Sequence, residues 1–288
     1  MNPDDFDFVS QFFKTRSGLV LTRDKAYLLD SRLMPVARKR DMKSVDDLIA
    51  AMRLGRDIQL LNDVTEAMTI NESFFFRDIK PFDMFRNVVL PMMIENRAAK
   101  KSIRIWCAAC SSGQEPYSLA MILREESAKL AGWRTEIVAT DISGEMVAKA
   151  KAGIYSQFEV QRGLPVQLLV KYFKKHEDMW QIDASLRAMV RYREFNLLHD
   201  LKGLGGFDVV FCRNVLIYFD NETKGKVLAQ ICKLMPEDGR LFLGGAETVL
   251  GISDRFKPVL GNRGLYEPAP AEARSSIPLR QAMPIAGA

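Results

Sequence analysis

From about residue 103 the chain alternates short β-rich runs with helical runs, and this alternation constrains the fold more than any other feature of the sequence. Strands that alternate with helices indicate a mostly parallel sheet covered by helices. A chain of 288 residues is long enough for such a domain and a smaller partner. We therefore expect an α/β fold built from IRIWCAA, PYSLAMILREESAKL, TEIVATD, FDVVFCRNVLIYF and GRLFLGG.

Three other segments lack this alternation. Residues 1–84 have helical spacing and no strand signal, which predicts a small all-α N-terminal domain ahead of an α/β domain at 85–268. A polar stretch at about 156–190 predicts a small inserted β-subdomain in which MWQI and MVRYREF pair as antiparallel strands. The segment 269–288 has no apolar period and is rich in Pro and Ala, which predicts a flexible tail.

The positive charge of the chain is concentrated in one region. The whole sequence has 41 Lys and Arg against 36 Asp and Glu, a net charge of +5. Residues 14–43 contain nine basic and three acidic side chains, and so carry +6. Such a patch favours an acidic partner, such as nucleic acid, a membrane surface or an acidic protein, although a solvated helix face remains an alternative.

No run is long enough for a membrane helix and no secretory signal is present, so we expect a cytoplasmic protein.

The run IRIWCAACSSGQEPYSLAM places a strand, a loop of small residues and a helix in succession. Such a loop lets a ligand approach the backbone closely. With Gly113 as its only glycine the run does not fit G-x-G-x-x-G, and the chain has no Walker-type GK[ST]. Asp141 ends the next strand, where an acid commonly accepts hydrogen bonds from ribose hydroxyls, although a cap or surface turn would also explain it. Together these features favour a nucleoside without phosphates, such as S-adenosylmethionine.

Other polar residues follow apolar runs. FDVVFCRNVLIYF places Arg213 and Asn214 at the carboxyl end of a buried strand, where open α/β sheets bind ligands.

Cys107 and Cys110 form C-x-x-C, but no second pair of ligands lies at a suitable spacing, so we expect no metal site. We assign the only two histidines, His176 and His199, to the surface.

Five motifs occur in order between about residues 5 and 268: NESFFFR, ACSSGQEPYS, ATDI, FNLL and FCRNVLIYF. This set resembles the CheR-type chemotaxis-receptor methyltransferases. The resemblance implies an S-adenosylmethionine-dependent, Rossmann-like methyltransferase domain with a mostly parallel seven-stranded sheet. It also implies methyl transfer to glutamate side chains of methyl-accepting chemotaxis receptors, giving glutamyl methyl esters and S-adenosylhomocysteine.

The resemblance also implies roles for individual residues. Arg77 and Tyr218 match the two side chains nearest the methyl-transfer centre. A glutamate carboxylate is ionised at neutral pH and needs no general base, so the site has to align it, and Arg77 could hold a carboxylate with its fork of donors. The implied cofactor contacts are Asn71, Ser73, Arg77, Glu115, Asp141, Asn196, Leu197, Cys212, Arg213, Asn214 and Val215.

Receptor methylation helices of this family carry glutamate clusters, which a basic helix would complement. We therefore predict that Arg32, Arg38, Lys39 and Arg40 guide docking. Some relatives hold a receptor C-terminal peptide on a β-subdomain with a glycine-rich loop. The matching stretch here, KKHEDMWQIDAS, has no glycine, so we expect no tight binding of that peptide.

Two other functions remain open. A nucleic-acid methyltransferase could use the basic patch for phosphates, but the chain has RNVLIYF where the amino-methylating kinds usually have Asp/Asn-Pro-Pro-aromatic. A signalling scaffold could sense S-adenosylmethionine without catalysis, although the presence of Arg77, Asp141 and Tyr218 argues against a degenerate enzyme. We expect neither nucleic-acid binding nor membrane insertion.

Overall fold

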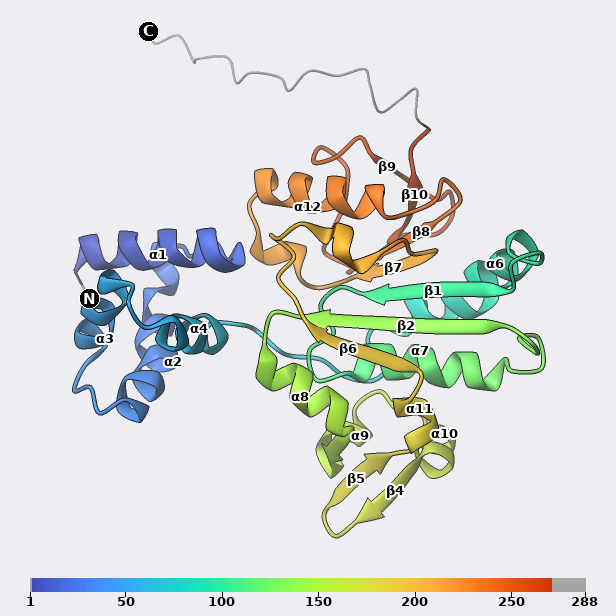
Figure 1. The fold of residues 1–288 in the computed structure, drawn as a ribbon, viewed down its shortest axis with the longest axis horizontal. Coiled ribbons are helices and arrows are strands. Elements are labelled where there is room, and N and C mark those ends of the chain that lie inside the picture. Colours follow the sequence, from blue (N-terminus) through green and yellow to red (C-terminus); the bar gives the residue numbers. More distant parts are fainter. Residues whose placement is uncertain (1, 271–288) are drawn as a thin grey trace, which may run out of the picture.

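A seven-stranded sheet forms the centre of the computed structural model, which describes residues 2–270 (Figure 1). The strand order is β6-β2-β1-β7-β8-β10-β9, and β6 through β8 run parallel while β10 is antiparallel to both neighbours. This confirms the predicted mostly parallel sheet. The strands are β1 (Ser102–Cys107), β2 (Arg134–Asp141), β6 (Val190–Glu194), β7 (Val209–Cys212), β8 (Arg240–Leu243), β9 (Phe256–Pro258) and β10 (Leu265–Pro268).

Helices cover both faces of this sheet. Alternate side chains of a strand point to opposite faces, so Ile105 of β1 packs in one apolar core and Trp106 in the other. The first core includes residues of α5, α6 and α7, and the second includes residues of α12 and η3. The helices of this sheet domain are α5 (Lys80–Met84), the π-helical η2 (Phe85–Val89), α6 (Leu90–Asn96), α7 (Gln114–Glu125), α8 (Gly144–Ala152), η3 (Leu201–Leu204), η4 (Leu216–Tyr218) and α12 (Asn221–Lys233).

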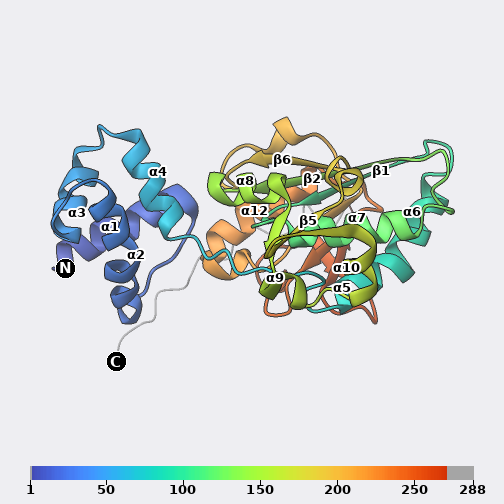
Figure 2. The same ribbon diagram turned by 90° about the horizontal axis from the view of Figure 1, so that it is seen from below.

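The N-terminal helices form a separate helical domain with its own apolar core (Figure 2). Three of them begin at residues whose side chains accept a backbone N–H: Asn2, Ser44 and Asp57. Pro35 lies inside α2 (Ala26–Lys39) without ending that helix. The segments are α1 (Pro3–Ser17), η1 (Arg23–Lys25), α2 (Ala26–Lys39), α3 (Val45–Leu54) and α4 (Ile58–Ala67).

The change from helical to sheet domain comes earlier than the predicted residue 84. Met68 is the last residue of the helical core, whereas Phe75, Phe82 and Phe85 are buried in the core of the sheet domain. The aromatic residues of NESFFFR therefore tie the following helices to the sheet. We call residues 68–79, between α4 and α5, the linker.

A three-stranded antiparallel sheet forms the insertion, but the predicted pairing of MWQI with MVRYREF is wrong. MWQI is β5, which pairs with β3 and β4 in the order β3-β5-β4, while the VRYRE of the second run is β6 of the main sheet. The reason is local: His176 opposes Met179 across a two-residue hairpin, so the strand before MWQI is its nearest partner. The subdomain contains β3 (Ile154–Ser156), α9 (Gln157–Gln161), α10 (Val166–Tyr172), β4 (Phe173–His176), β5 (Met179–Ile182) and α11 (Ala184–Arg187).

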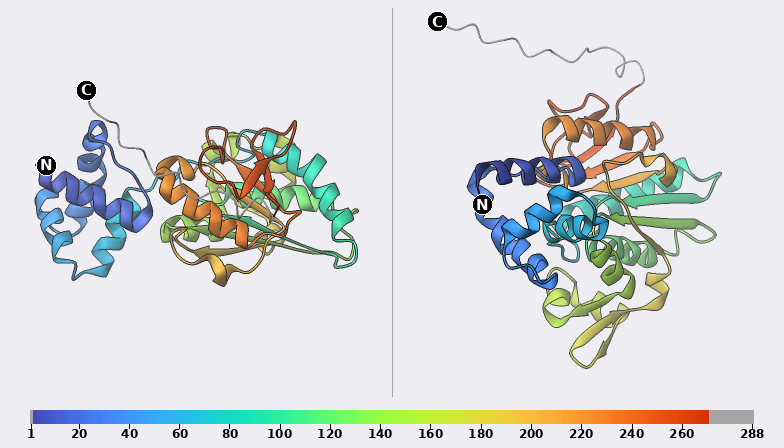
Figure 3. Two further views of the ribbon diagram at one scale, coloured as in Figure 1. Left: turned by 90° about the horizontal axis from the view of Figure 1, so that it is seen from above. Right: turned by 60° about the vertical axis from the view of Figure 1, so that its left-hand side comes forward.

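The helical domain contacts the sheet domain through α1 and α4 (Figure 3). Lys14 of α1 pairs with Asp220, the N-cap of α12, at 2.8 Å. Gly18 ends α1 with a φ of 78°, and a Cβ there would lie 2.8 Å from the ring of Phe219. From α4, Glu66 accepts hydrogen bonds at the start of α8. Close backbone packing and polar contacts thus hold the two domains together.

No helix in residues 2–270 is long and apolar enough to cross a membrane. The predicted flexible tail lies outside the described residues from residue 271 onward.

Candidate active site

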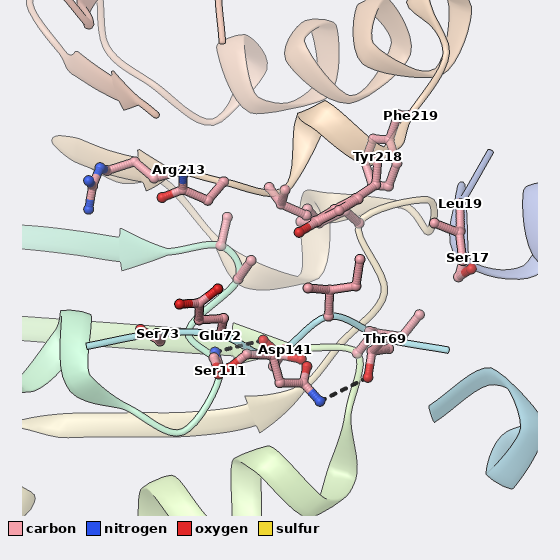
Figure 4. Close-up of a pocket in the computed structure, with 18 of the residues that line it drawn as sticks. Ser17, Leu19, Thr69, Glu72, Ser73, Ser111, Asp141, Arg213, Tyr218 and Phe219 are labelled. Carbon is pink, nitrogen blue, oxygen red and sulfur yellow. Dashed lines mark hydrogen bonds between the residues drawn. The ribbon is translucent and has the colours of Figure 1, made fainter. Parts of the chain in front are cut away.

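A cavity of about 990 Å³, open mouth included, lies between the carboxyl ends of the central strands, the linker and the helical domain (Figure 4). Ligands of open α/β sheets bind at this edge. The cavity is lined by Ser17, Leu19, Met68, Thr69, Ile70, Asn71, Glu72, Ser73, Arg77, Ala108, Ala109, Ser111, Glu115, Asp141, Ile142, Phe195, Asn196, Leu197, Arg213, Asn214, Val215, Tyr218 and Phe219.

Asp141 presents a buried carboxylate at the end of β2. Its two oxygens accept backbone N–H groups from Ser111 at 2.7 Å and Ser143 at 3.0 Å. Burial raises the pKa of Asp141, and these backbone hydrogen bonds oppose that shift. A carboxylate has about four acceptor positions, so it retains capacity for hydroxyl groups of a ligand.

Arg213 and Glu115 form a buried ion pair, and both residues line the cavity. Arg213 Nη1 donates to Glu115 at 2.8 Å, and Nη2 donates to Asp78 at 2.7 Å and to the carbonyl of Arg77 at 2.9 Å. Burial raises the pKa of Glu115, while the Arg213 charge opposes this. Within residues 2–270, the buried Nε of Arg213 has no hydrogen-bond partner.

These groups fit S-adenosylmethionine. Asp141 offers acceptors for a ribose diol, Glu115 adds a negative charge suited to a cationic ligand, and Arg213 retains one unsatisfied N–H for a carboxylate. Asn71 and Ser111 join the cofactor side to the linker, since the Ser111 hydroxyl donates to the Asn71 carbonyl at 2.6 Å.

Tyr218 and Arg77 line the cavity, and both are partly exposed. Figure 4 shows Tyr218 above the open space and Asp141 below it. Burial raises the pKa of Tyr218, so its hydroxyl stays protonated at neutral pH. Arg77 Nη1 donates to the carbonyl of Glu72 at 2.7 Å, the only hydrogen bond of its side chain within the described residues. Both histidines are exposed, and neither lines the cavity.

The structure brings eleven of the predicted active-site residues to this one cavity, and leaves one out. The eleven are Asn71, Ser73, Arg77, Glu115, Asp141, Asn196, Leu197, Arg213, Asn214, Val215 and Tyr218. Cys212 is fully buried at the end of β7, in the core on the α12 side of the sheet, and does not line the cavity. Strand alternation explains this difference, because Cys212 points into the core while the next residue begins the loop.

The four predicted docking residues lie on α2 or at its end and differ in their surroundings. Arg38 and Lys39 are exposed. Arg40 pairs with Asp57 at 2.6 Å and Asp63 at 2.8 Å, so its charge is used inside the helical domain. Arg32 donates to the carbonyls of Met68 and Thr69 at the end of α4.

Sequence reasoning missed several residues of the site. Ser111 and Glu72 lie inside motifs that were singled out, so their positions could have suggested them. Ser17 and Leu19 line the cavity from the helical domain, and no motif pointed to them.

Glu247 was also missed, and it shapes the loop after β7. Its buried carboxylate accepts the N–H groups of Asn214 at 2.8 Å, Val215 at 2.9 Å and Gly244 at 2.6 Å. A single acid in a loop of mixed sequence gave no signal of this role.

The fold is a mostly parallel sheet, and its cavity contains an acid placed to bind ribose hydroxyls but no phosphate-binding loop. This combination is typical of the class of S-adenosylmethionine-dependent methyltransferases. Comparison with protein families identifies the type within it. The model for the CheR methyltransferase SAM-binding domain matches residues 71–265, and the model for the CheR methyltransferase all-alpha domain matches residues 4–69. The chain belongs to the CheR methyltransferase family.

Curated relatives match over nearly the whole chain. Chemotaxis protein methyltransferase Cher2 of Pseudomonas putida is 38% identical over 91% of this chain and 96% of that protein. Chemotaxis protein methyltransferase 1 of Pseudomonas aeruginosa is 40% identical over the same shares. Among solved structures, PKMT2 from Rickettsia typhi aligns with 60% of this chain and 26% of its own, with a TM-score of 0.37 and 16% identity.

Proposed function

We propose that the protein transfers the methyl group of S-adenosylmethionine to glutamate side chains of chemotaxis receptors, forming glutamyl methyl esters and S-adenosylhomocysteine. The observation that carries this proposal is the guanidinium of Arg77, which makes one hydrogen bond within the described residues and, like Tyr218, lines a cavity that fits the cofactor. The names of the relatives, chemotaxis protein methyltransferases, support the same substrate class.

When bound, S-adenosylmethionine supplies an electrophilic methyl group on a sulfonium. The substrate carboxylate is already a nucleophile at neutral pH, so the protein needs no base, in keeping with a cavity that no histidine lines. Arg77 orients the carboxylate with charge-assisted hydrogen bonds, and Tyr218 donates from its protonated hydroxyl or packs against the reacting groups. Asn71, Ser73, Glu115, Asp141, Asn196, Leu197, Arg213, Asn214 and Val215 hold the cofactor.

The partners in this proposal are the cytoplasmic methylation helices of receptors, which places the enzyme in the cytoplasm. The exposed Arg38 and Lys39 would attract the glutamate clusters of those helices. A nucleic-acid substrate is not favoured, because the relatives named above are chemotaxis protein methyltransferases.

Incubation with labelled S-adenosylmethionine and receptor cytoplasmic fragments tests the proposal. Glutamyl methyl esters release methanol in alkali, so the label on the fragment becomes volatile. Arg77→Ala removes the carboxylate-binding fork and reduces the rate by at least about 100-fold. Stable, non-volatile label on the fragment, or label on nucleic acid, would contradict the proposal.

A further inference from the structure

Glu72 places a glutamate side chain at the mouth of the cavity, which is the same side chain that the proposed reaction modifies. It lines the cavity and is exposed. In Figure 4 Glu72 extends from the linker into the space that lies below Arg213 and Tyr218. A substrate glutamate that enters on this side of the cavity therefore meets an internal carboxylate.

Two arginines contact Glu72, one at its backbone and one at its side chain. Arg77 donates to its backbone carbonyl at 2.7 Å, and Arg162 Nη2 lies 2.5 Å from its carboxylate. Both guanidinium groups also lie over the ring of Phe74, at 5.6 Å for Arg77 and 4.3 Å for Arg162. Because both distances are measured to one centroid, the guanidinium carbons are at most 9.9 Å apart (5.6 Å plus 4.3 Å). The two guanidinium groups are partly exposed and are neighbours at one aromatic ring.

Backbone packing fixes Arg162 at this place. The next residue, Gly163, has a φ of 80°, and a Cβ there would lie 2.1 Å from the carbonyl oxygen of Phe75. Only glycine permits this approach, which presses the segment after α9 directly onto the linker. Arg162 therefore comes from the inserted subdomain but is held beside the cavity independently of its ion pair.

The ion pair between Arg162 and Glu72 is weak enough to exchange. The side chains are 40% and 59% exposed, and exposed pairs of this kind contribute little because solvent and salt screen them. Arg162 lowers the pKa of Glu72 and keeps it ionised. An incoming carboxylate can replace that of Glu72 without exposing an unpaired buried charge.

We propose that Arg162 is a second substrate-positioning arginine, which binds the carboxylate of the substrate glutamate together with Arg77 after displacing Glu72. Arg162 itself lies just outside the residues that line the cavity, so it reaches the substrate where Glu72 now lies. This inference rests on the proposed receptor-glutamate methylation. It makes Glu72 a built-in competitor, and it gives the inserted subdomain a part in substrate selection.

The test compares Arg162→Gln, Glu72→Gln and the double variant on a receptor cytoplasmic fragment with glutamate at its methylation sites and on the same fragment with glutamine there. Binding is measured by calorimetry with S-adenosylhomocysteine present, and the KM by methanol release. Arg162→Gln raises the KM about three- to tenfold and reduces the preference for the glutamate form. Glu72→Gln lowers the KM about two- to threefold, the double variant resembles Arg162→Gln, and Arg162→Lys retains part of the preference.

Arg191→Gln is the matched control, since Arg191 is an exposed arginine that also forms an ion pair, with Glu136 on the sheet. It leaves the KM and the preference for glutamate unchanged. A wild-type KM and preference in Arg162→Gln would overturn the inference. So would a double variant restored to wild-type behaviour, because Arg162 would then serve only to restrain Glu72. A wild-type protein that releases no methanol with the glutamate form contradicts the proposed function itself.

Discussion

The carboxylate of Asp141 both organises the loop after β1 and offers acceptors to a ligand. Its oxygens accept N–H groups of Ser111 and Ser143, which belong to loops that follow different strands. Because these donors lie in the backbone, the carboxylate keeps its place whether or not a ligand is present.

Asp141→Asn should weaken S-adenosylmethionine binding by roughly 10- to 100-fold, because an amide has one acceptor oxygen in place of two and carries no charge. Calorimetry with the cofactor measures this loss. Asp254→Asn, at an exposed aspartate, is the control and keeps wild-type affinity. Equal affinities for Asp141→Asn and the control would show that this carboxylate does not bind the cofactor.

At the residue scale, sequence motifs predicted residues that line the cavity but not what those residues contact. Arg213 was found because it follows a buried strand, whereas its bonds to Glu115 and Asp78 join parts of the chain about 100 and 135 positions away. Glu247 is a similar case, since three of its four N–H partners lie in the loop after β7 and meet it only after β7 and β8 have paired. Such contacts depend on the tertiary fold.

At the scale of elements, α2 presents its basic residues in two ways. Arg38 and Lys39 face solvent, while Arg40 at its end is paired inside the helical domain. The three residues are consecutive and all basic, so the sequence does not distinguish them. The folded structure shows which of the charges are exposed and which is used in ion pairs within the domain.

Arg38→Glu and Lys39→Glu should each raise the KM for a receptor fragment about two- to fivefold, because reversed charges repel a glutamate-rich helix. The effect should shrink as salt is added, since the charges are exposed. Lys226→Glu, on the exposed face of α12, is the control for a change in net charge. A methylation rate that stays at the wild-type value at low salt would rule out docking through α2.

The hairpin β4–β5 should not bind the receptor C-terminal peptide with micromolar affinity. Its two-residue loop consists of Glu177 and Asp178, both exposed and acidic, and it lacks the glycine-rich loop of relatives that bind the peptide. Calorimetric titration with an aromatic-containing receptor peptide should give only heats of dilution. A relative with the glycine-rich loop serves as the positive control, and a micromolar Kd for this chain would contradict the prediction.

Sequence reasoning predicted the type of most elements but not every partner. The runs that became β1, β2, β7 and β8 were expected as strands, because each is apolar and bounded by loop residues. The partner of MWQI was missed because KYFKKH is polar and short, and its strand geometry depends on the hairpin that follows it. Strand pairing is a relation between segments, which single runs do not specify.

At the scale of the whole molecule, the pair between Lys14 and Asp220 joins the two domains. Lys14 lowers the pKa of Asp220, helped by Thr223, whose N–H the carboxylate accepts at 2.8 Å. A carboxyl group with a lowered pKa in the folded state stabilises that state above its unfolded pKa of about 3.9. The contribution is lost as the pH falls from that value through the folded pKa.

Asp220→Asn should therefore lower the Tm by about 1 to 3 °C at pH 7, because asparagine keeps the helix cap but loses the ion pair. The difference from wild type should shrink as the pH falls below about 4, because the unfolded wild-type chain then takes up a proton that the folded carboxylate, with its lowered pKa, does not. Unfolding followed by tryptophan fluorescence from pH 7 to pH 3 measures both curves. A difference that is constant with pH would show that the ion pair does not stabilise the fold.

The predicted division of the chain shows what sequence reveals at this scale. The helical and α/β parts were recognised from their periodicities. Phe75 and Phe82 were placed in the helical domain, because apolar residues of this kind also occur in a helical core, whereas they pack in the core of the sheet domain. Their burial against the sheet depends on where the linker runs. The contribution of Ser17 and Leu19 to the cavity likewise depends on how the two domains dock.

Because both domains line the cavity, ligand binding and domain docking are thermodynamically coupled. A ligand that contacts Ser17 and Leu19 on one side and Asp141 on the other favours the docked arrangement of the domains by the free energy of those contacts. Linkage is reciprocal. A change that separates the two domains therefore lowers the affinity for the ligand by the same factor by which the bound ligand favours the docked arrangement. The amides of α1 and α4 should then exchange with solvent deuterium more slowly as the cavity fills, which makes exchange in the helical domain a gauge of occupancy in the sheet domain.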